Sequence, residues 1–221
     1  MSKPLLSSIL ETAEHVNAYI SRIFKSKEKD KLYQAAYHLL KAGGKRLRPY
    51  LVVKVCEAVG GSREQALPAA AAIELLHNFT LVHDDVMDQD AFRRGVPTVH
   101  TVWGVPMAIL AGDLLFAKVF EIALELLDRK VPASMVTKVI GELARVTVTI
   151  SEGQALDMSF SSDKRIIEEQ EYLDMISRKT AALFEASSAI GAMVGNAEES
   201  LITSLRKYGF SIGMAFQIKD D

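Results

Sequence analysis

The run Pro68-Ala69-Ala70-Ala71-Ala72-Ile73-Glu74-Leu75-Leu76 decides the fold class of this chain. Apolar side chains would cover most of the circumference of a helix formed by these residues. Such a helix is stable in water only when other elements enclose it. The run therefore predicts a helical protein in which this segment is surrounded by further helices.

The rest of the chain repeats its apolar residues at helical spacing, with only six prolines to interrupt it. The pattern predicts helices near residues 4–25, 28–41, 48–59, 63–89, 105–128, 133–159, 166–194 and 197–221. Residues 146–150 favour a strand by propensity, but their flanks favour a helix. Without strand–helix alternation, a short repeat or a low-complexity linker, we expect an all-α fold. Residues 1–221 would form one large bundle of long, mostly antiparallel helices.

Composition narrows the class of protein. The 221 residues are 49% apolar and 24% charged, with a formal net charge of −2, which favours neither nucleic acid nor an anionic membrane as a partner. The lone Cys56 excludes an internal disulfide and fits a buried core residue in a reducing compartment. With no secretory signal and no uninterrupted apolar run of about 18 residues, we expect a cytoplasmic protein without a membrane span.

Three carboxylates stand together in His83-Asp84-Asp85-Val86-Met87-Asp88. On a helix Asp84 and Asp88 share a face one turn apart, and Asp85 flanks them. Their mutual repulsion, near the expected end of the helix, favours a bound cation. Oxygen ligands without a zinc-type His/Cys set indicate Mg²⁺, with Mn²⁺ as the alternative ion, shared with substrate phosphates. A solvated acidic helix end is the alternative interpretation.

Two basic segments accompany this cluster. In Gly43-Gly44-Lys45-Arg46-Leu47-Arg48-Pro49, paired glycines allow a close approach of the backbone to a ligand, and Lys45 and Arg48 stand where a helix begins. Arg93-Arg94-Gly95 follows the carboxylates and is expected to fold back over them. Two cationic sites with one carboxylate site suggest two anionic substrates and hence a transfer reaction.

With these residues the chain resembles the trans-isoprenyl diphosphate synthases, or polyprenyl synthetases, along essentially its whole length. The matching motifs, in family order, are Gly43–Pro49, Glu74–His77, Asp84–Asp88 with Arg93–Gly95, Gly112-Asp113, Glu152–Gln154 with Asp157, Lys179-Thr180 and Phe216–Asp221. Seven motifs in order are far more specific than one aspartate motif. The resemblance implies the isoprenoid synthase fold, with its helices around a central cavity, and a homodimer.

The resemblance also implies roles for individual residues. A site for isopentenyl diphosphate would be formed by Lys45, Arg48, His77 and Arg94. Ligands for Mg²⁺ would be Asp84 and Asp88, supported by Asp85, and Asp220, supported by Asp221. The allylic diphosphate, whether dimethylallyl, geranyl or farnesyl, would touch Arg93 and Lys179. The cavity around its carbon chain would be lined by Gln154, Asp157, Thr180 and Gln217. Loss of diphosphate would leave an allylic cation, which the isopentenyl double bond attacks.

Product length is expected to depend on Phe79 and Thr80, five and four residues before Asp84. A helix rises about 1.5 Å per residue, so Phe79 would lie roughly 7–8 Å below Asp84. In the resembled family a bulky ring there, followed by a small residue, is the archaeal pattern for a C20 product, geranylgeranyl diphosphate. A farnesyl or a longer-chain synthase is the alternative, and Phe79 could instead be ordinary core.

The sequence ends at Lys219-Asp220-Asp221, inside the second aspartate motif. Relatives are expected to continue further, so we expect a C-terminally incomplete domain and little activity if the chain stops there. A class I terpene cyclase is a weaker interpretation, because it would not need the set of Lys45, Arg48 and His77. A non-catalytic, regulatory subunit of a heteromeric synthase is another, although such partners tend to lose the first aspartate motif.

Overall fold

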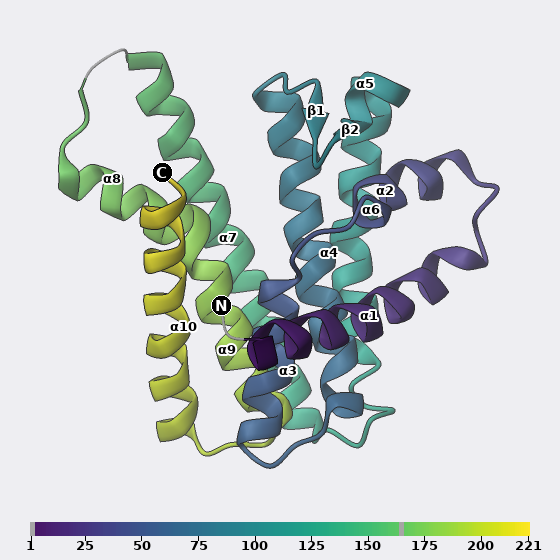
Figure 1. The fold of residues 1–221 in the computed structure, drawn as a ribbon, viewed down its shortest axis with the longest axis vertical. Helices are drawn as coiled ribbons and strands as arrows, with labels where there is room; N and C mark the ends of the chain where they lie inside the picture. Colours follow the sequence, from purple (N-terminus) through teal and green to yellow (C-terminus); the bar gives the residue numbers. More distant parts are fainter. Residues whose placement is uncertain (1–2, 164–165) are drawn as a thin grey trace. The chain divides into compact units, whose positions relative to one another are not determined.

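A computed structural model describes residues 3–163 and 166–221, and Figure 1 shows their helices as ribbons. The elements are α1 (Lys3–Lys25), α2 (Lys31–Lys41), α3 (Leu47–Ala58), α4 (Arg63–Met87), β1 (Phe92–Arg93), β2 (Val96–Pro97), α5 (Val99–Trp103), α6 (Val105–Leu124), α7 (Ala133–Asp163), α8 (Glu169–Ile176), the π-helix η1 (Ser177–Ala181), α9 (Ala182–Val194) and α10 (Glu199–Asp220). The prediction of an all-α fold is confirmed, since the only pairing of strands in this part of the chain is the β1–β2 hairpin.

Most predicted helices are found within a few residues of their expected bounds, and residues 146–150 lie inside α7 despite their strand propensity. Three features differ from the prediction. The short hairpin and α5 were not predicted, and the helix expected over residues 166–194 is divided by η1. In η1 the amide of Ala182 donates to the carbonyl of Ser177, a five-residue step that widens one turn.

The described residues form two compact units. Unit 1 comprises Met1–Tyr50 and Leu67–Glu125, and unit 2 comprises Leu51–Ala66 and Leu126–Asp221. In unit 1, α2 packs against α5 and α6. Fully buried leucines on these helices and on α4, among them Leu39, Leu75, Leu76 and Leu115, contribute to its core. The quoted run in α4 is buried from Pro68 to Leu76, as its apolar circumference predicts.

In unit 2, α9 packs against α7 and α10, and Figure 1 shows the yellow α10 running beside it. Every residue of α9 except Glu185 is buried. Close packing depends on small residues, because a Cβ atom on Gly209 would stand 2.5 Å from the carbonyl oxygen of Phe184. Cys56 is buried, and this burial raises the pKa of its thiol to about 11. It is therefore a core residue, as predicted.

A charge cluster around the buried Glu142 ties these helices together. Glu142 on α7 accepts hydrogen bonds from Arg206 on α10 at 2.6 and 2.9 Å, and from Arg145 at 2.6 Å. Arg206 and Arg145 also contact Glu185 on α9. Burial alone would raise the pKa of the Glu142 carboxyl, but the hydrogen bonds from Arg206 and Arg145 outweigh it, so the pKa is lowered.

Among the helices described, none is long and apolar enough to cross a membrane.

Candidate active site

The predicted carboxylate cluster lies at the C-terminal end of α4, in unit 1. Asp84 and Asp85 belong to the last helical turn, and the amide of Asp88 still donates to the carbonyl of Asp84 at 2.8 Å. Gln89 then ends the helical path with a positive φ of 57°. Asp84 is half-buried, Asp85 is buried and Asp88 is exposed. Asp84 and Asp88 thus remain one turn apart on one face, as their spacing predicts.

Asp85 has a different environment from its neighbours. One of its oxygens, Oδ1, pairs with Nε of Arg93, whose guanidinium also contacts Asp90 at 3.2 Å. Its other oxygen, Oδ2, is buried with no hydrogen-bond partner in the structure. Burial raises the pKa of the Asp85 carboxyl, while Arg93 acts in the opposite direction. Arg93 therefore folds back over the cluster as expected, and here it contacts a carboxylate of that cluster.

The β1–β2 hairpin carries the second basic segment. Arg93 pairs with Val96, so Arg94 and Gly95 form a two-residue turn. Both have positive φ, 53° and 77°, as a type I′ turn requires. Nη1 of Arg94 donates to the carbonyls of Gly43 and Leu39 and, at 3.3 Å, to Oδ1 of Asn78. The turn thus brings Arg94 to the first basic segment.

That first segment connects α2 to α3. Gly43 and Gly44 have φ values of 93° and 145°, and exposed Lys45 follows them. Arg48 lies in the first turn of α3, with Nη1 3.4 Å from Nε2 of His77 on α4. Burial lowers the pKa of Arg48 to about 10. Burial and the nearby Arg48 hold the pKa of His77 well below its usual value, so the imidazole is neutral at neutral pH.

The residues predicted to control product length lie on the same helix. The ring of Phe79 packs against Phe116 of α6, with centroids 5.1 Å apart, and against His83 at 4.9 Å. Thr80 donates its hydroxyl to the carbonyl of His77 at 2.8 Å. Phe116 continues the aromatic group to Phe120. Phe79 is half-buried, so its ring forms part of an aromatic wall on the α4–α6 contact.

The remaining predicted residues all belong to unit 2. Asp157 on α7 pairs with Lys179 in η1, and Thr180 donates to Oε1 of Gln217 on α10 at 2.9 Å. Nε2 of Gln217 in turn donates to Asp221 at 2.8 Å. Asp220 is exposed at the end of α10.

Gln154 differs from its unit 2 neighbours. It is 7% exposed, and both atoms of its amide are buried without a hydrogen-bond partner in the structure. Next to it, a Cβ atom on Gly153 would stand 2.4 Å from the amide nitrogen of Lys179. The backbone of α7 therefore directly touches η1. Within unit 2 the structure brings together Asp157 with Lys179, and Thr180 with Gln217.

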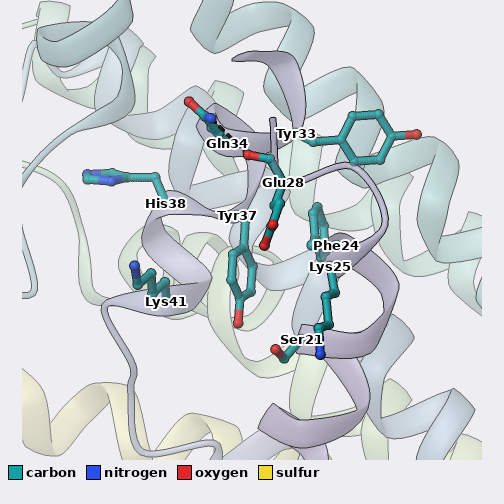
Figure 2. Close-up of a pocket in the computed structure, with 9 residues that line it drawn as sticks. All are labelled: Ser21, Phe24, Lys25, Glu28, Tyr33, Gln34, Tyr37, His38 and Lys41. Carbon is teal, nitrogen blue, oxygen red and sulfur yellow. Dashed lines mark hydrogen bonds between the residues drawn. The ribbon is translucent and has the colours of Figure 1, made fainter. Parts of the chain in front are cut away.

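A separate cavity of about 570 Å³ opens between the end of α1 and α2. Figure 2 shows its lining residues, Ser21, Phe24, Lys25, Glu28, Tyr33, Gln34, Tyr37, His38 and Lys41. Its wall includes Phe24 and Tyr37, whose rings stack with centroids 5.0 Å apart. None of these nine residues belongs to the predicted site, so this cavity and the carboxylate cluster are distinct features of unit 1.

Mg²⁺ fits the carboxylate cluster by the chemistry of its donors. Asp84 and Asp88 offer oxygen ligands one turn apart, and Oδ2 of Asp85 is an unpartnered oxygen beside them. Over residues 3–163 and 166–221, no three His, Cys, Asp or Glu side chains are grouped to hold a metal by themselves. Mg²⁺ usually takes one or two carboxylates and completes its shell with water and phosphate oxygens.

Sequence reasoning assigned no role to three residues that organise the basic site, Arg46, Glu74 and Asn78, although Arg46 and Glu74 stand within quoted motifs. All three are buried, with exposed fractions of 4%, 2% and 0%. Glu74 accepts from Arg46 and from Asn78. A glutamate and an asparagine four residues apart within an otherwise apolar helical run were the available signal, because buried polar groups need partners.

Comparison with known proteins gives a consistent result. Residues 29–221 match the family model for polyprenyl synthetase. The geranylgeranyl diphosphate synthase of Sulfolobus acidocaldarius is 52% identical over 211 residues, which cover 96% of this chain and 63% of that protein. The geranylgeranyl diphosphate synthase of Methanosarcina mazei is 43% identical, over 100% of this chain and 67% of that protein. The chain thus spans about two-thirds of the length of these relatives.

Solved structures agree with the sequence relatives. The geranylgeranyl pyrophosphate synthetase of Geoglobus acetivorans superposes with a TM-score of 0.90 at 47% identity, covering 96% of this chain and 68% of that one. The geranylgeranyl pyrophosphate synthetase of Pyrococcus horikoshii superposes with a TM-score of 0.92 at 44% identity, covering 99% of this chain and 65% of that one. The predicted isoprenoid synthase fold is therefore confirmed.

Proposed function

This chain belongs to the polyprenyl synthetase family, and from that premise we propose that it condenses isopentenyl diphosphate with an allylic diphosphate to extend a prenyl chain. The observation that carries the proposal is the composition of unit 1. It combines a carboxylate pair, Asp84 and Asp88, with a basic group of Arg48, His77 and Arg94 on neighbouring elements. One anion would bind through a metal ion and the other through guanidinium groups directly.

The basic group suits a diphosphate that needs no metal. Guanidinium forks match phosphate oxygens, and a neutral His77 beside Arg48 can donate or accept a hydrogen bond without adding charge repulsion. Lys45 adds an exposed ammonium from the same loop. We assign these four residues to isopentenyl diphosphate.

Asp84 and Asp88 would hold Mg²⁺, supported by Asp85, and Asp220 a further ion, supported by Asp221. When bound, Mg²⁺ would neutralise charge on the allylic diphosphate as it leaves. Arg93 would contact that group once it exchanges its present partner, Asp85, for phosphate oxygens. In unit 2 we assign Lys179, which now pairs with Asp157, to phosphate oxygens as well.

The transfer step needs no dedicated protein base, because the released diphosphate can accept the proton. The allylic C–O bond breaks and its electron pair leaves with the diphosphate. The isopentenyl double bond then attacks the allylic carbon, and the released diphosphate accepts the proton that restores a double bond. The oxygens of Thr180 and Gln217 would lie beside the developing positive charge, and Gln154 and Asp157 would line the same cavity. Exclusion of water protects the cation from capture.

We propose geranylgeranyl diphosphate as the product. The relatives from S. acidocaldarius and M. mazei carry that name, and Phe79 with Thr80 matches the expected C20 pattern. The test is incubation with Mg²⁺, farnesyl diphosphate and labelled isopentenyl diphosphate, with products separated by length. A C20 product from the native sequence and longer products from Phe79→Ala would support both assignments. If neither this chain nor a version extended past Asp221 incorporates the label, the proposed function is overturned.

A second copy of the chain is the partner we propose. Four apolar side chains on α5 and α6 are exposed, with exposed fractions of 45–52%: Val102, Val105, Ile109 and Leu110. A contiguous apolar patch on a protein surface marks an interaction site, and we propose that these four side chains form one. Light scattering on the purified chain should give a dimer mass that Leu110→Glu reduces to the monomer. Activity that appears only with a different homologous chain would instead favour a regulatory subunit.

A further inference from the structure

We propose that Glu74 is the positioning residue of the metal-free diphosphate site, fixing the Gly43–Arg48 loop and the hairpin residue Arg94 through one buried carboxylate. This inference rests on the proposed function, because it concerns the site assigned to isopentenyl diphosphate. Neither Glu74 nor its neighbour Asn78 would touch the ligand. Their role would be to hold the residues that do.

The first connection runs from Glu74 to the loop. Nη1 of Arg46 contacts Oε1 of Glu74 at 2.5 Å, with the two side chains 1% and 3% exposed. The same guanidinium donates to the carbonyl of Gly43 at 3.1 Å and to that of Leu40 at 2.7 Å. Its Nε donates to Asn17 on α1 at 2.9 Å. Arg46 thus binds two backbone carbonyls of the turn that precedes Arg48, and Glu74 fixes the position of the Arg46 guanidinium.

The second connection runs from Glu74 to the hairpin. Nδ2 of Asn78 donates to Oε1 of Glu74 at 2.8 Å and to the backbone carbonyl of the same residue at 2.8 Å. This fixes the amide so that its Oδ1 faces Arg94, which donates to it at 3.3 Å. Arg94 also donates to the carbonyl of Gly43. Loop and hairpin therefore share one buried polar group on α4.

The backbone conformation shows that this arrangement is held against a local cost. Arg46 and Arg94 both have positive φ, 50° and 53°, which non-glycine residues seldom adopt. A Cβ atom on Gly44 would stand 3.1 Å from Cζ of Arg94 and 3.2 Å from Nη1 of Arg46. Two guanidinium groups thus pack against one glycine, and the carboxylate of Glu74 opposes their repulsion.

Electrostatics and positioning predict opposite results for one substitution, which makes the inference testable. Glu74 is the carboxylate that counters desolvation at both Arg48 and Arg94. If Glu74 only balanced charge, Glu74→Gln would leave a more positive site and tighten diphosphate binding. If Glu74 positions the arginines, the same variant loses affinity despite the added positive charge.

The experiment is a calorimetric titration of isopentenyl diphosphate into the 221-residue chain with EDTA present. Every residue assigned to this ligand belongs to unit 1. The titration measures binding alone, so turnover is not required. We expect Glu74→Gln to weaken binding about ten- to hundredfold, and Asn78→Ala about tenfold. Inorganic pyrophosphate, as a second probe, should show the same loss, since the network holds groups that would contact the diphosphate.

Glu57→Gln is the matched control. It removes the same charge from a half-exposed carboxylate that pairs with Lys54 at 2.8 Å, and it should leave affinity unchanged. Circular dichroism reports whether each variant is folded. Unchanged or tighter binding by folded Glu74→Gln would overturn the inference while leaving the proposed function intact. If that variant does not fold, unchanged binding by Asn78→Ala has the same meaning. No binding by the unsubstituted chain would overturn both.

Discussion

The contact between α7 and η1 leads to a sharp prediction for Gly153→Ala. A methyl group at residue 153 would stand 2.4 Å from the amide nitrogen of Lys179, 2.8 Å from its Cα and 2.9 Å from the carbonyl carbon of Arg178. These are backbone atoms, so no side-chain rotation can relieve the overlap. To accept the methyl group, α7 and η1 must separate at the point where Asp157 pairs with Lys179.

The magnitude follows from two opposing terms. Overpacking of a well-packed interior costs about 1–3 kcal/mol, and contact with rigid backbone places this case at about 3. Alanine in place of glycine inside a helix returns about 1 kcal/mol. We therefore expect a net loss of about 2 kcal/mol in the free energy of unfolding. The same separation would displace Lys179 and Thr180, so prenyl transfer should fall by more than stability alone explains.

Gly141→Ala is the matched control, because Gly141 lies on the same helix and a Cβ atom there would meet nothing within 4 Å. It should gain about 0.5–1 kcal/mol from helix propensity alone. Urea denaturation followed by circular dichroism measures both variants. If Gly153→Ala is as stable as the unsubstituted chain while Gly141→Ala shows its gain, the packing argument is wrong.

Three other perturbations have defined signs. Acidification from pH 7.5 to 5.5 should destabilise the folded protein by about 1 kcal/mol through His77, because burial keeps the folded-state pKa low while the unfolded imidazole binds a proton below about pH 6.5; urea midpoints should show a smaller change for His77→Gln. Glu142→Gln should cost about 2 kcal/mol by weakening the charge-assisted hydrogen bonds from Arg206 and Arg145, although Arg206 keeps its contact with Glu185. Because the pKa of Glu142 is lowered in the folded state, its contribution should persist at neutral pH, begin to fall below the unfolded pKa of about 4.3, and be lost as the pH falls through the lower folded pKa; the cost of the substitution should therefore be smaller in denaturation at pH 3 than at pH 7. Gly44→Ala, at a φ of 145°, should cost about 1 kcal/mol and weaken isopentenyl diphosphate binding, which thermal melting and calorimetry can separate.

The long helices could be predicted because burial on one or more faces imposes a period on the sequence. Residues 146–150 show the strength of this signal, since packing within α7 overrides their strand propensity. The hairpin could not be found in this way, because two-residue strands have no period. Its signal was the turn at Arg94 and Gly95, which is weak because arginine is an unusual residue at positive φ.

The site was predictable where chemistry depends on spacing along one helix. Asp84 and Asp88 are one turn apart in sequence and in structure, and the return of Arg93 over the cluster follows from a short connection. The hub at Glu74 was not predictable in the same way. Its direct partners, Arg46 and Asn78, in turn bond to α1, the α2–α3 loop and the hairpin, which only tertiary folding brings together.

The widened turn at η1 acts as a phase shift in the pattern of side chains. A five-residue step uses one residue more than an α-helical step, so every side chain from Ala182 onward points about 100° away from the direction an unbroken helix would give it. A hydrophobic wheel drawn across residues 166–194 therefore assigns the inner face correctly on only one side of the turn. Deleting one residue within Ser177–Ala181 would restore the α-helical step and leave the buried face of α9 directed toward α7 and α10, whereas an unbroken α-helix of the full sequence would rotate that face away.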